Sequence, residues 1–138
     1  MTIITETITA DQARHAIASA GACAERIGVA ANIAVLDAGA HSMRSSAWTP
    51  RSSDRLISPC ANPTAALFAV SSEAVWKFCK PGAPAHNLEA SNGGLAPFAG
   101  GLPIHGANGA MIGAIGVSGS AVPQDLEIAE AAVTVLLG

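Results

Sequence analysis

The stretch LPIHGANGAMIGAIGVSG, from Leu102 to Gly119, most constrains the fold because it predicts an antiparallel hairpin. Residues 102–104 favour a strand, Asn108-Gly109 is a strong turn signal, and residues 110–117 favour a second strand. Glycines interrupt that second strand, where they allow another backbone or a ligand to come close. A hairpin of this kind needs helices or further strands to cover it.

The segments before the hairpin alternate helix and strand. Thr9 to Gln12 has the pattern of a capping box, which predicts a helix to about Ile27, and Gly28 suits the left-handed position after its end. The apolar stripe of this helix is Ala13, Ile17, Ala20, Ala24 and Ile27. The run ANIAVLDAG, residues 31–39, then reads as a buried strand that ends in a turn, where Asp37 either caps the turn or contacts a ligand.

Two further helical regions follow. Residues 63–80 favour a helix with Asn62 as its cap, and two adjacent serines midway mark a break. Residues 81–101 form a long loop rich in glycine and proline, of a length that is commonly functional. Pro123 is expected to start the last helix, because its fixed φ suits a first turn. The core stripe of that helix is expected to be Leu126, Ala129, Val133 and Leu136.

Composition narrows the class of protein. The 138 residues suit one domain, and the order of elements predicts an α+β fold with an antiparallel sheet. Only 12% of the residues are charged, which favours burial of some surface in a homo-oligomer, a dimer or higher. No apolar run reaches the ~20 residues that span a bilayer, and the first residues do not read as a signal peptide, so we expect a cytoplasmic protein without membrane contact.

Charge and cysteine patterns exclude other classes. The net charge of −3, with scattered Lys and Arg, gives no footprint for nucleic acid. Cys23, Cys60 and Cys79 are widely spaced and form no C-x-x-C motif, so neither a disulfide framework nor a metal site is predicted.

Four segments together carry a resemblance to a known family. They are ANIAVLDAGAH, NGGLAPFAGGLPI, GAMIGAIGVSGS and QDLEIAEAA. They resemble the GlcG/HbpS-type family, which includes the C-terminal domain of PduO-type proteins and is often labelled haem-binding. The resemblance implies a profilin-like fold with a five-stranded antiparallel sheet flanked by helices, a homo-oligomer, and haem or a related tetrapyrrole as the small-molecule ligand. Some relatives act in the catabolism of aromatic compounds, as hydroxylaminobenzoate lyases.

Residues 41–63 depart from the family pattern. The family continues here with an apolar strand, an R-M-D segment and the start of a helix, whereas this chain has HSMRSSAWTPRSSDRLISPCANP. With suitable synonymous codons, residues 41–62 read one frame away give LHAFVRMDAAFLGSIDIAMRK, which is the missing segment. We hypothesise that this stretch carries a frameshift, which leaves open a reading in which the chain is a non-functional product.

Several residues are candidates for ligand binding. His15 lies opposite the apolar stripe of the first helix, where it is either simply exposed or an axial ligand of haem at a subunit interface. Gly100, Gly101 and Ser118 allow a planar ligand or an anion to approach the backbone, or else they serve tight sheet packing. His105 is expected to be exposed beside the hairpin turn, and Trp76 and Phe78 are read as core or interface residues.

An enzyme is the alternative to a binding protein. Glu89 and Asn92 lie in the long loop, where a carboxylate near other polar groups could do acid and base work. The same residues would equally suit a solvated loop. On the enzyme reading they are the catalytic residues of a cofactor-free lyase or isomerase that acts on a small aromatic substrate.

Overall fold

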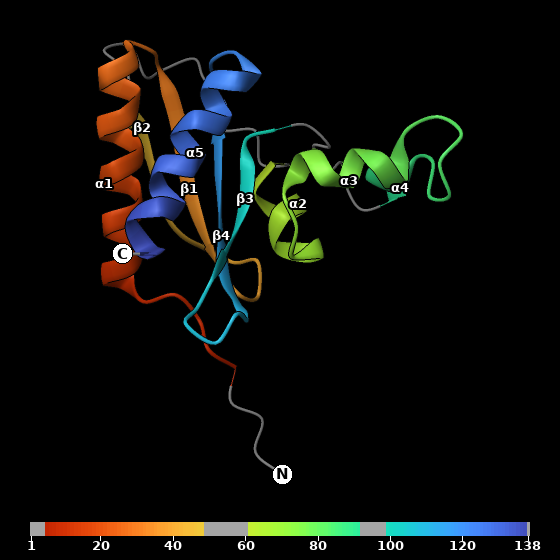
Figure 1. Ribbon diagram of the computed structural model, residues 1–138, viewed down its shortest axis with the longest axis horizontal. Coiled ribbons are helices and arrows are strands. Elements are labelled where there is room, and N and C mark those ends of the chain that lie inside the picture. The colour runs from red at the N-terminus through yellow and green to blue at the C-terminus, as the bar shows by residue number, and fades with distance from the viewer. Residues whose placement is uncertain (1–4, 49–60, 92–98, 138) are drawn as a thin grey trace.

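The computed structural model describes residues 5–48, 61–91 and 99–137, and all statements below refer to these residues. Helices and strands follow one another along the chain as Figure 1 shows. Their bounds are α1 Ala10–Ile27, β1 Ala31–Asp37, β2 Ser42–Trp48, α2 Ala61–Phe68, α3 Ser72–Cys79, α4 Leu88–Ser91, β3 Gly101–His105, β4 Met111–Ser118 and α5 Val122–Leu137.

The described strands form one antiparallel sheet in the order β2-β1-β4-β3. The α+β class and the hairpin of β3 and β4 are therefore confirmed. The sheet was expected to have five strands, but the described residues form four. The segment before α1 donates a backbone hydrogen bond from Ile8 to the carbonyl of Ile112, at 2.8 Å, without continuing as a strand. This hydrogen bond attaches the N-terminal segment to β4, but the segment does not form a fifth strand.

Helices α1 and α5 lie side by side over one face of the sheet (Figure 1). Their contact is lined by small side chains, among them Ala16, Ala20 and Ala132, which are fully buried. Small residues let two helices approach closely, and the hydroxyl of Ser19 uses this proximity to donate to the carbonyl of Ala131, at 3.0 Å. Most of the core lies between this helix pair and the sheet.

Helix α2 covers the opposite face. Ala65 and Ala66 pack there against Leu36 of β1 and Ala114 of β4 in a second, smaller apolar cluster. Because helices cover both faces, β1 is buried from residue 31 to residue 36 without the alternation of a half-exposed strand. The continuous aliphatic run in the sequence has this cause.

The first helix follows its prediction closely. Thr9 and Gln12 form the reciprocal capping box, and Gly28 ends the helix at φ 72°. The last helix differs in its buried face, which consists of Asp125, Ile128, Ala129 and Ala132. The predicted Leu126, Val133 and Leu136 are only half-buried at its border. The buried face of α5 therefore shares only Ala129 with the predicted stripe.

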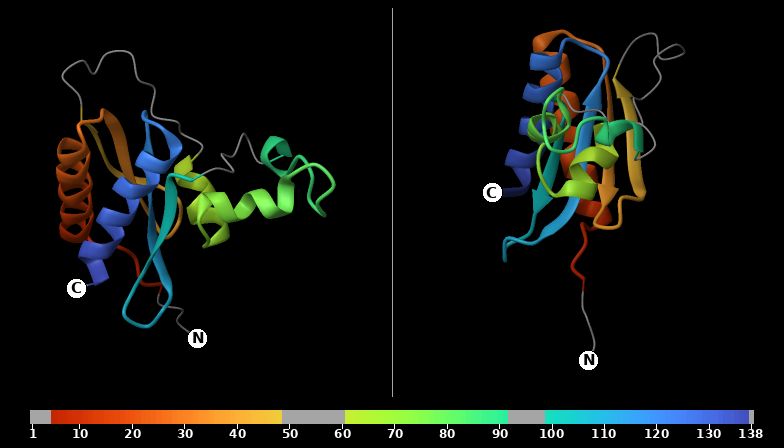
Figure 2. Two further views of the ribbon diagram at one scale, coloured as in Figure 1. Left: turned by 45° about the horizontal axis from the view of Figure 1, so that its top comes forward. Right: turned by 90° about the vertical axis from the view of Figure 1, so that its right-hand side faces the viewer.

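The middle of the chain breaks where the serines predicted. Helix α2 ends at Phe68, and the Ser71 hydroxyl accepts from the backbone N–H of Ala74, at 3.2 Å, to start α3. Asn62 is not a cap, because α2 begins at Ala61. The long loop also contains the short helix α4. Helices α3 and α4 project beyond the β3 edge of the sheet (Figures 1 and 2), and we call residues 70–91 the arm.

One side chain ties the arm to the sheet. The buried hydroxyl of Ser72 accepts from the N–H of Gly101, at 2.9 Å, and donates to the carbonyl of the same residue, at 3.3 Å. Gly101 opens the edge strand β3, so these two groups point away from β4. A single hydroxyl therefore satisfies the donor and acceptor that an edge strand otherwise leaves unpaired.

The unusual segment begins with a regular strand. The backbone of β2 pairs with β1 from Ala31 opposite Trp48 to Leu36 opposite Ser42, with one irregularity between Val35 and Leu36. Residues 49–60 lie outside the described residues, as do the side chains of β2. The frameshift hypothesis therefore stays a prediction.

Replacing residues 41–62 with the shifted reading should raise the free energy of unfolding. Each aliphatic side chain placed in a core position is worth about 2 to 5 kcal/mol, because it removes apolar surface from water and fills space in the core. Urea denaturation compares the two chains, with a scrambled insert of the same composition as control. An equal or lower midpoint for the shifted reading would count against the hypothesis.

Gly100 sits where a side chain cannot. A Cβ built on it would lie 2.7 Å from the carbonyl oxygen of Val117, and its φ of +131° is rarely adopted by other residues. Its own carbonyl accepts from the N–H of Val117, at 2.8 Å. The glycine is therefore required for the close approach of the chain to β4.

Gly100→Ala should destabilise the fold by about 2 to 4 kcal/mol, because backbone strain adds to a clash with a backbone atom that cannot move aside. Gly109→Ala is the matched control, since its φ is +83° but nothing lies within 4 Å of the added Cβ. Denaturant midpoints measure both. Equal losses would mean that strain alone, and not the clash, makes Gly100 necessary.

Candidate functional site

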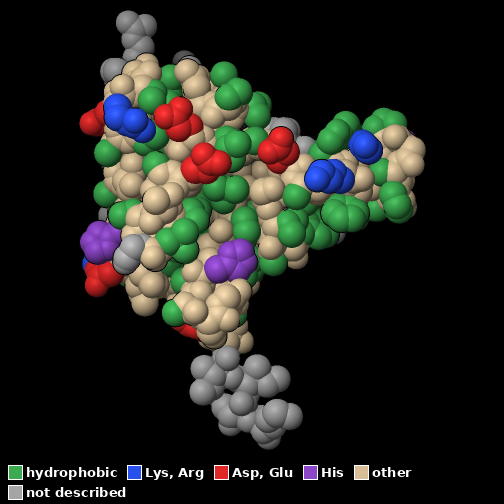
Figure 3. Space-filling model, in the orientation of Figure 1, with side chains coloured by type: hydrophobic (Ala, Val, Ile, Leu, Met, Phe, Trp, Pro, Cys, Tyr) green, Lys and Arg blue, Asp and Glu red, His purple; other side chains and the backbone are tan. Residues whose placement is uncertain are grey.

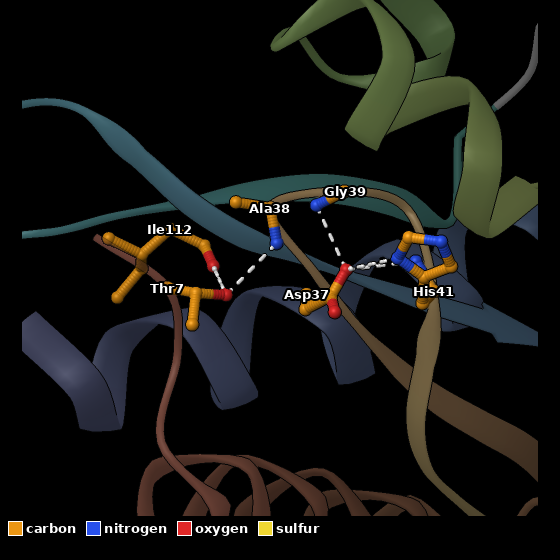
Figure 4. Close-up of polar contacts among 6 residues, drawn as sticks. All are labelled: Thr7, Asp37, Ala38, Gly39, His41 and Ile112. Atoms are coloured by element: carbon orange, nitrogen blue, oxygen red, sulfur yellow. Dashed lines mark hydrogen bonds and ion pairs between the residues drawn. The ribbon is translucent and has the colours of Figure 1, made fainter. Parts of the chain in front are cut away.

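The turn between β1 and β2 is held by one carboxylate, drawn in Figure 4. Oδ1 of Asp37 accepts from the backbone N–H groups of Gly39 and His41, each at 2.9 Å, and lies 3.3 Å from Nδ1 of His41. The pKa of Asp37 is lowered mainly by the hydrogen bond from the His41 backbone, with smaller contributions from Gly39 and the His41 ring. Turn capping, one of the two roles predicted for Asp37, is therefore confirmed.

The N-terminal segment locks this turn to the sheet. The Thr7 hydroxyl accepts from the N–H of Ala38, at 3.2 Å, and donates to the carbonyl of Ile112, at 3.3 Å (Figure 4). The turn, β4 and the chain entering α1 are thus joined through one side chain. The His41 ring itself is 82% exposed.

The predicted glycines come together at one end of the hairpin. Gly101 pairs with Gly116, and Ser118 ends β4 opposite Asn32. Gly100 lies close to the carbonyl of Val117, and Gly101 is hydrogen-bonded to Ser72, so tight packing explains why glycines occupy these two positions. Their role in binding a cofactor, like that of Ser118, stays a prediction.

A carboxylate occupies the helix start beside these glycines. Asp125 is 5% exposed, and its Oδ1 accepts from the N–H of Ser120, at 3.1 Å. Oε1 of Gln124 accepts from the N–H of Ala121, at 3.3 Å, and from the Ser120 hydroxyl. These side chains already accept from the backbone N–H groups at the start of α5, so an anion would have to compete with them for the positive end of the helix.

The other candidates lie apart from the hairpin. His15 is exposed on α1, which packs over β1 and β2, whereas β3 forms the other edge of the sheet. Glu89 belongs to α4, at the far end of the arm, and its side chain is outside the described residues, as is all of Asn92. A single chain therefore does not bring His15, Gly101 and α4 into one site.

Metal ligands and cysteines form no cluster in the described ranges. No three His, Cys, Asp or Glu side chains there lie close enough to hold a metal ion. Cys23 and Cys79 are buried free thiols, and Cys60 falls among the residues not described. His105 is exposed, as predicted, and none of the helices described is long and apolar enough to cross a membrane.

Sequence patterns missed an apolar pocket at the root of the arm. It has a volume of about 390 Å³ and is lined by Phe68, Val70, Val75, Phe78, Ala85 and Leu88. Phe78 is 56% exposed and Trp76 is 45% exposed, so neither belongs to the core. The signal in the sequence was the apolar pair Phe68 and Val70, which continues past the end of α2.

Asp37→Asn should lower stability at neutral pH, because the amide accepts the same hydrogen bonds with less charge. A lowered pKa in the folded state stabilises the fold above the ordinary value of 3.8, and this contribution is lost as the pH falls through the lowered value. Denaturation midpoints of variant and parent should therefore converge in acid. Glu130→Gln, at an exposed carboxylate in the middle of α5, is the control, and a gap that does not depend on pH would contradict the assignment.

Comparison with known proteins gives a family and a fold. The family described as "Haem degrading protein HbpS-like" matches residues 8–134. The Klebsiella pneumoniae protein ORFY superposes with a TM-score of 0.88 at 26% identity, over 99% of this chain and 95% of its own. A double mutant of HbpS from Streptomyces reticuli gives 0.84 at 25% identity, over 99% and 90%.

A third structure, a complex of PduOC with haem, gives a TM-score of 0.82 at 24% identity, over 93% of this chain and 94% of that one. A search of curated protein sequences found no match. The family match covers nearly the whole chain and agrees with the segments that suggested it. This chain therefore belongs to the HbpS-like family.

Proposed function

We propose that this protein binds haem or a related tetrapyrrole. Membership of a family described as haem-degrading supports the proposal, and so does the haem complex of PduOC, which shares the fold. A haem site needs an axial donor beside an apolar or flat surface that admits the macrocycle.

His15 meets the first need. Its side chain leaves α1 on the exposed face, so its imidazole is accessible from outside the chain. Arg14, the preceding residue, is also exposed and pairs with Asp11. Its guanidinium offers a charged partner for the carboxylates that haem carries at its edge.

The surface beside His15 meets the second need in part. Ala18 and Ala22 follow it at three- and seven-residue steps, and both are exposed. Residues at this spacing share a helix face, so a strip without bulky side chains runs along α1 next to the imidazole. This strip is the observation on which the proposal rests, since it lets a flat ring reach the donor.

A single copy supplies only one wall of such a site. We therefore propose that α1 of a second copy closes it, which agrees with the homo-oligomer expected from the low charge content. Bound haem would supply a redox-active iron, while the residues of this chain would hold and orient it. Gly100, Gly101 and Ser118 belong to the β3–β4 part of the sheet, whereas His15 is exposed on the outer side of α1, so they would contact a ligand held by His15 only from another copy.

The enzyme alternative has less support. Its residues, Glu89 and Asn92, lack described side chains, and the comparisons do not favour a lyase or isomerase. A non-functional product remains distinguishable by experiment, because it would bind no ligand and unfold without cooperativity. We propose a cytoplasmic location on the basis of the sequence alone.

Haem added to the purified apo protein should give a saturable red shift of the Soret band at a fixed stoichiometry. His15→Ala should lose that shift, because iron loses its axial nitrogen. His105→Ala is the matched control, since His105 is also exposed but lies at the end of β3. A full shift in His15→Ala would place the donor elsewhere, and a weak, non-saturating change in the parent would contradict haem binding.

A further inference from the structure

The pocket at the root of the arm has fixed walls. The N–H of Ala85 donates to the carbonyl of Phe78, at 2.9 Å, which folds the turn after α3 back onto that helix. Further backbone bonds from Ala83 to Lys80 and from Leu88 to Ala85, each at 3.0 Å, hold the turn itself. Ser72 fixes the start of α3 to the sheet edge. The pocket therefore exists before any ligand arrives.

The chemistry of the walls is uniform. The six lining side chains named above carry no polar or ionisable group, and two of them are phenylalanines. A volume of about 390 Å³ falls in the lower part of the range, roughly 300 to 1,000 Å³, that holds small molecules. Such walls favour binding of an uncharged ring system, whereas a charged ligand would lose its hydration without gaining a polar partner.

Both charged and apolar side chains are exposed around α3, and the apolar ones outside the pocket lining include Leu67 and Trp76. Glu73, Lys77 and Lys80 are exposed on or next to α3. Figure 3 shows charged side chains on the projecting arm beside its hydrophobic ones. The centre of an interface between protein copies is usually depleted of Lys and Glu, and the exposed Glu73, Lys77 and Lys80 all lie on or next to α3, which forms one wall of the pocket. A small molecule therefore fits this hollow better than a second copy.

We propose that this pocket binds an uncharged aromatic compound of one or two rings. The site is separate from His15 and does not depend on haem. Its walls come from the end of α2, from α3 and from the turn that leads to α4, so it belongs to one chain.

The neutral two-ring fluorophore 6-propionyl-2-(dimethylamino)naphthalene, added to the apo protein, tests the proposal. Its emission should rise saturably, and naphthalene should displace it. Ala85→Leu should weaken binding about tenfold or more, because the added side chain fills the pocket. Ala83→Leu is the matched control, since Ala83 is similarly half-buried in the same turn but does not line the pocket.

A second pair of variants guards against misfolding of Ala85→Leu. Phe78→Ala removes a wall that is already half exposed and should also weaken binding, whereas Trp76→Ala, on the same helix but outside the lining, should not. Circular dichroism checks that each variant is folded. His15→Ala should bind the fluorophore normally, which separates this site from the haem proposal.

Two results would overturn the proposal. One is fluorophore binding that is absent, or that is equal in Ala85→Leu, Ala83→Leu and the parent. The other is an oligomer, measured by sedimentation, that excludes the fluorophore and dissociates in Ala85→Leu and Phe78→Ala. The second result would identify the pocket as a contact between copies of this chain.

Discussion

The antiparallel pairing of β1 with β4 is the contact on which the other elements depend. It joins residues that are about 80 positions apart, and it runs from Asn32 opposite Ser118 to Asp37 opposite Gly113. A Cβ on Gly113 would lie 2.5 Å from the carbonyl oxygen of Leu36, so the pairing at this end requires glycine. Both strands are buried on both faces because helices cover the sheet from either side.

Around this pair of strands, polar side chains form hydrogen bonds with the backbone at the ends and edges of the sheet. Asp37 closes one end of β1, Thr7 joins that turn to β4, and Asp125 closes the path from β4 into α5. Ser72 satisfies the open side of β3. Each of these side chains forms hydrogen bonds with backbone groups that have no partner in the sheet. A buried backbone group without a hydrogen bond would lower the free energy of unfolding by about 1 to 3 kcal/mol. These four residues therefore shape the edges that a ligand or a second copy would meet.

Two surfaces of different character remain outside the core. The exposed face of α1 carries an imidazole beside small residues, and the arm carries an apolar pocket. We propose a planar group with a metal at its centre as the ligand of the first surface, and a neutral ring as the ligand of the second. Both arise from helices that touch the sheet on one side only, which leaves their other sides free for function.

Local patterns in the sequence predicted four features correctly, because each depends only on residues that are close together in the chain. They are the capping box at Thr9, the left-handed Gly28, the Asn108-Gly109 turn and the break at Ser71. They also carried the family resemblance and the exposure of His15. The number of strands, the buried face of α5 and the partners of Gly100 and Ser72 depend on which distant segments meet. The pocket on the arm depends on the same thing, since its walls combine the end of α2, α3 and a later turn. Periodicity describes one helix at a time, and only the packing of several elements decides where their side chains leave a hollow.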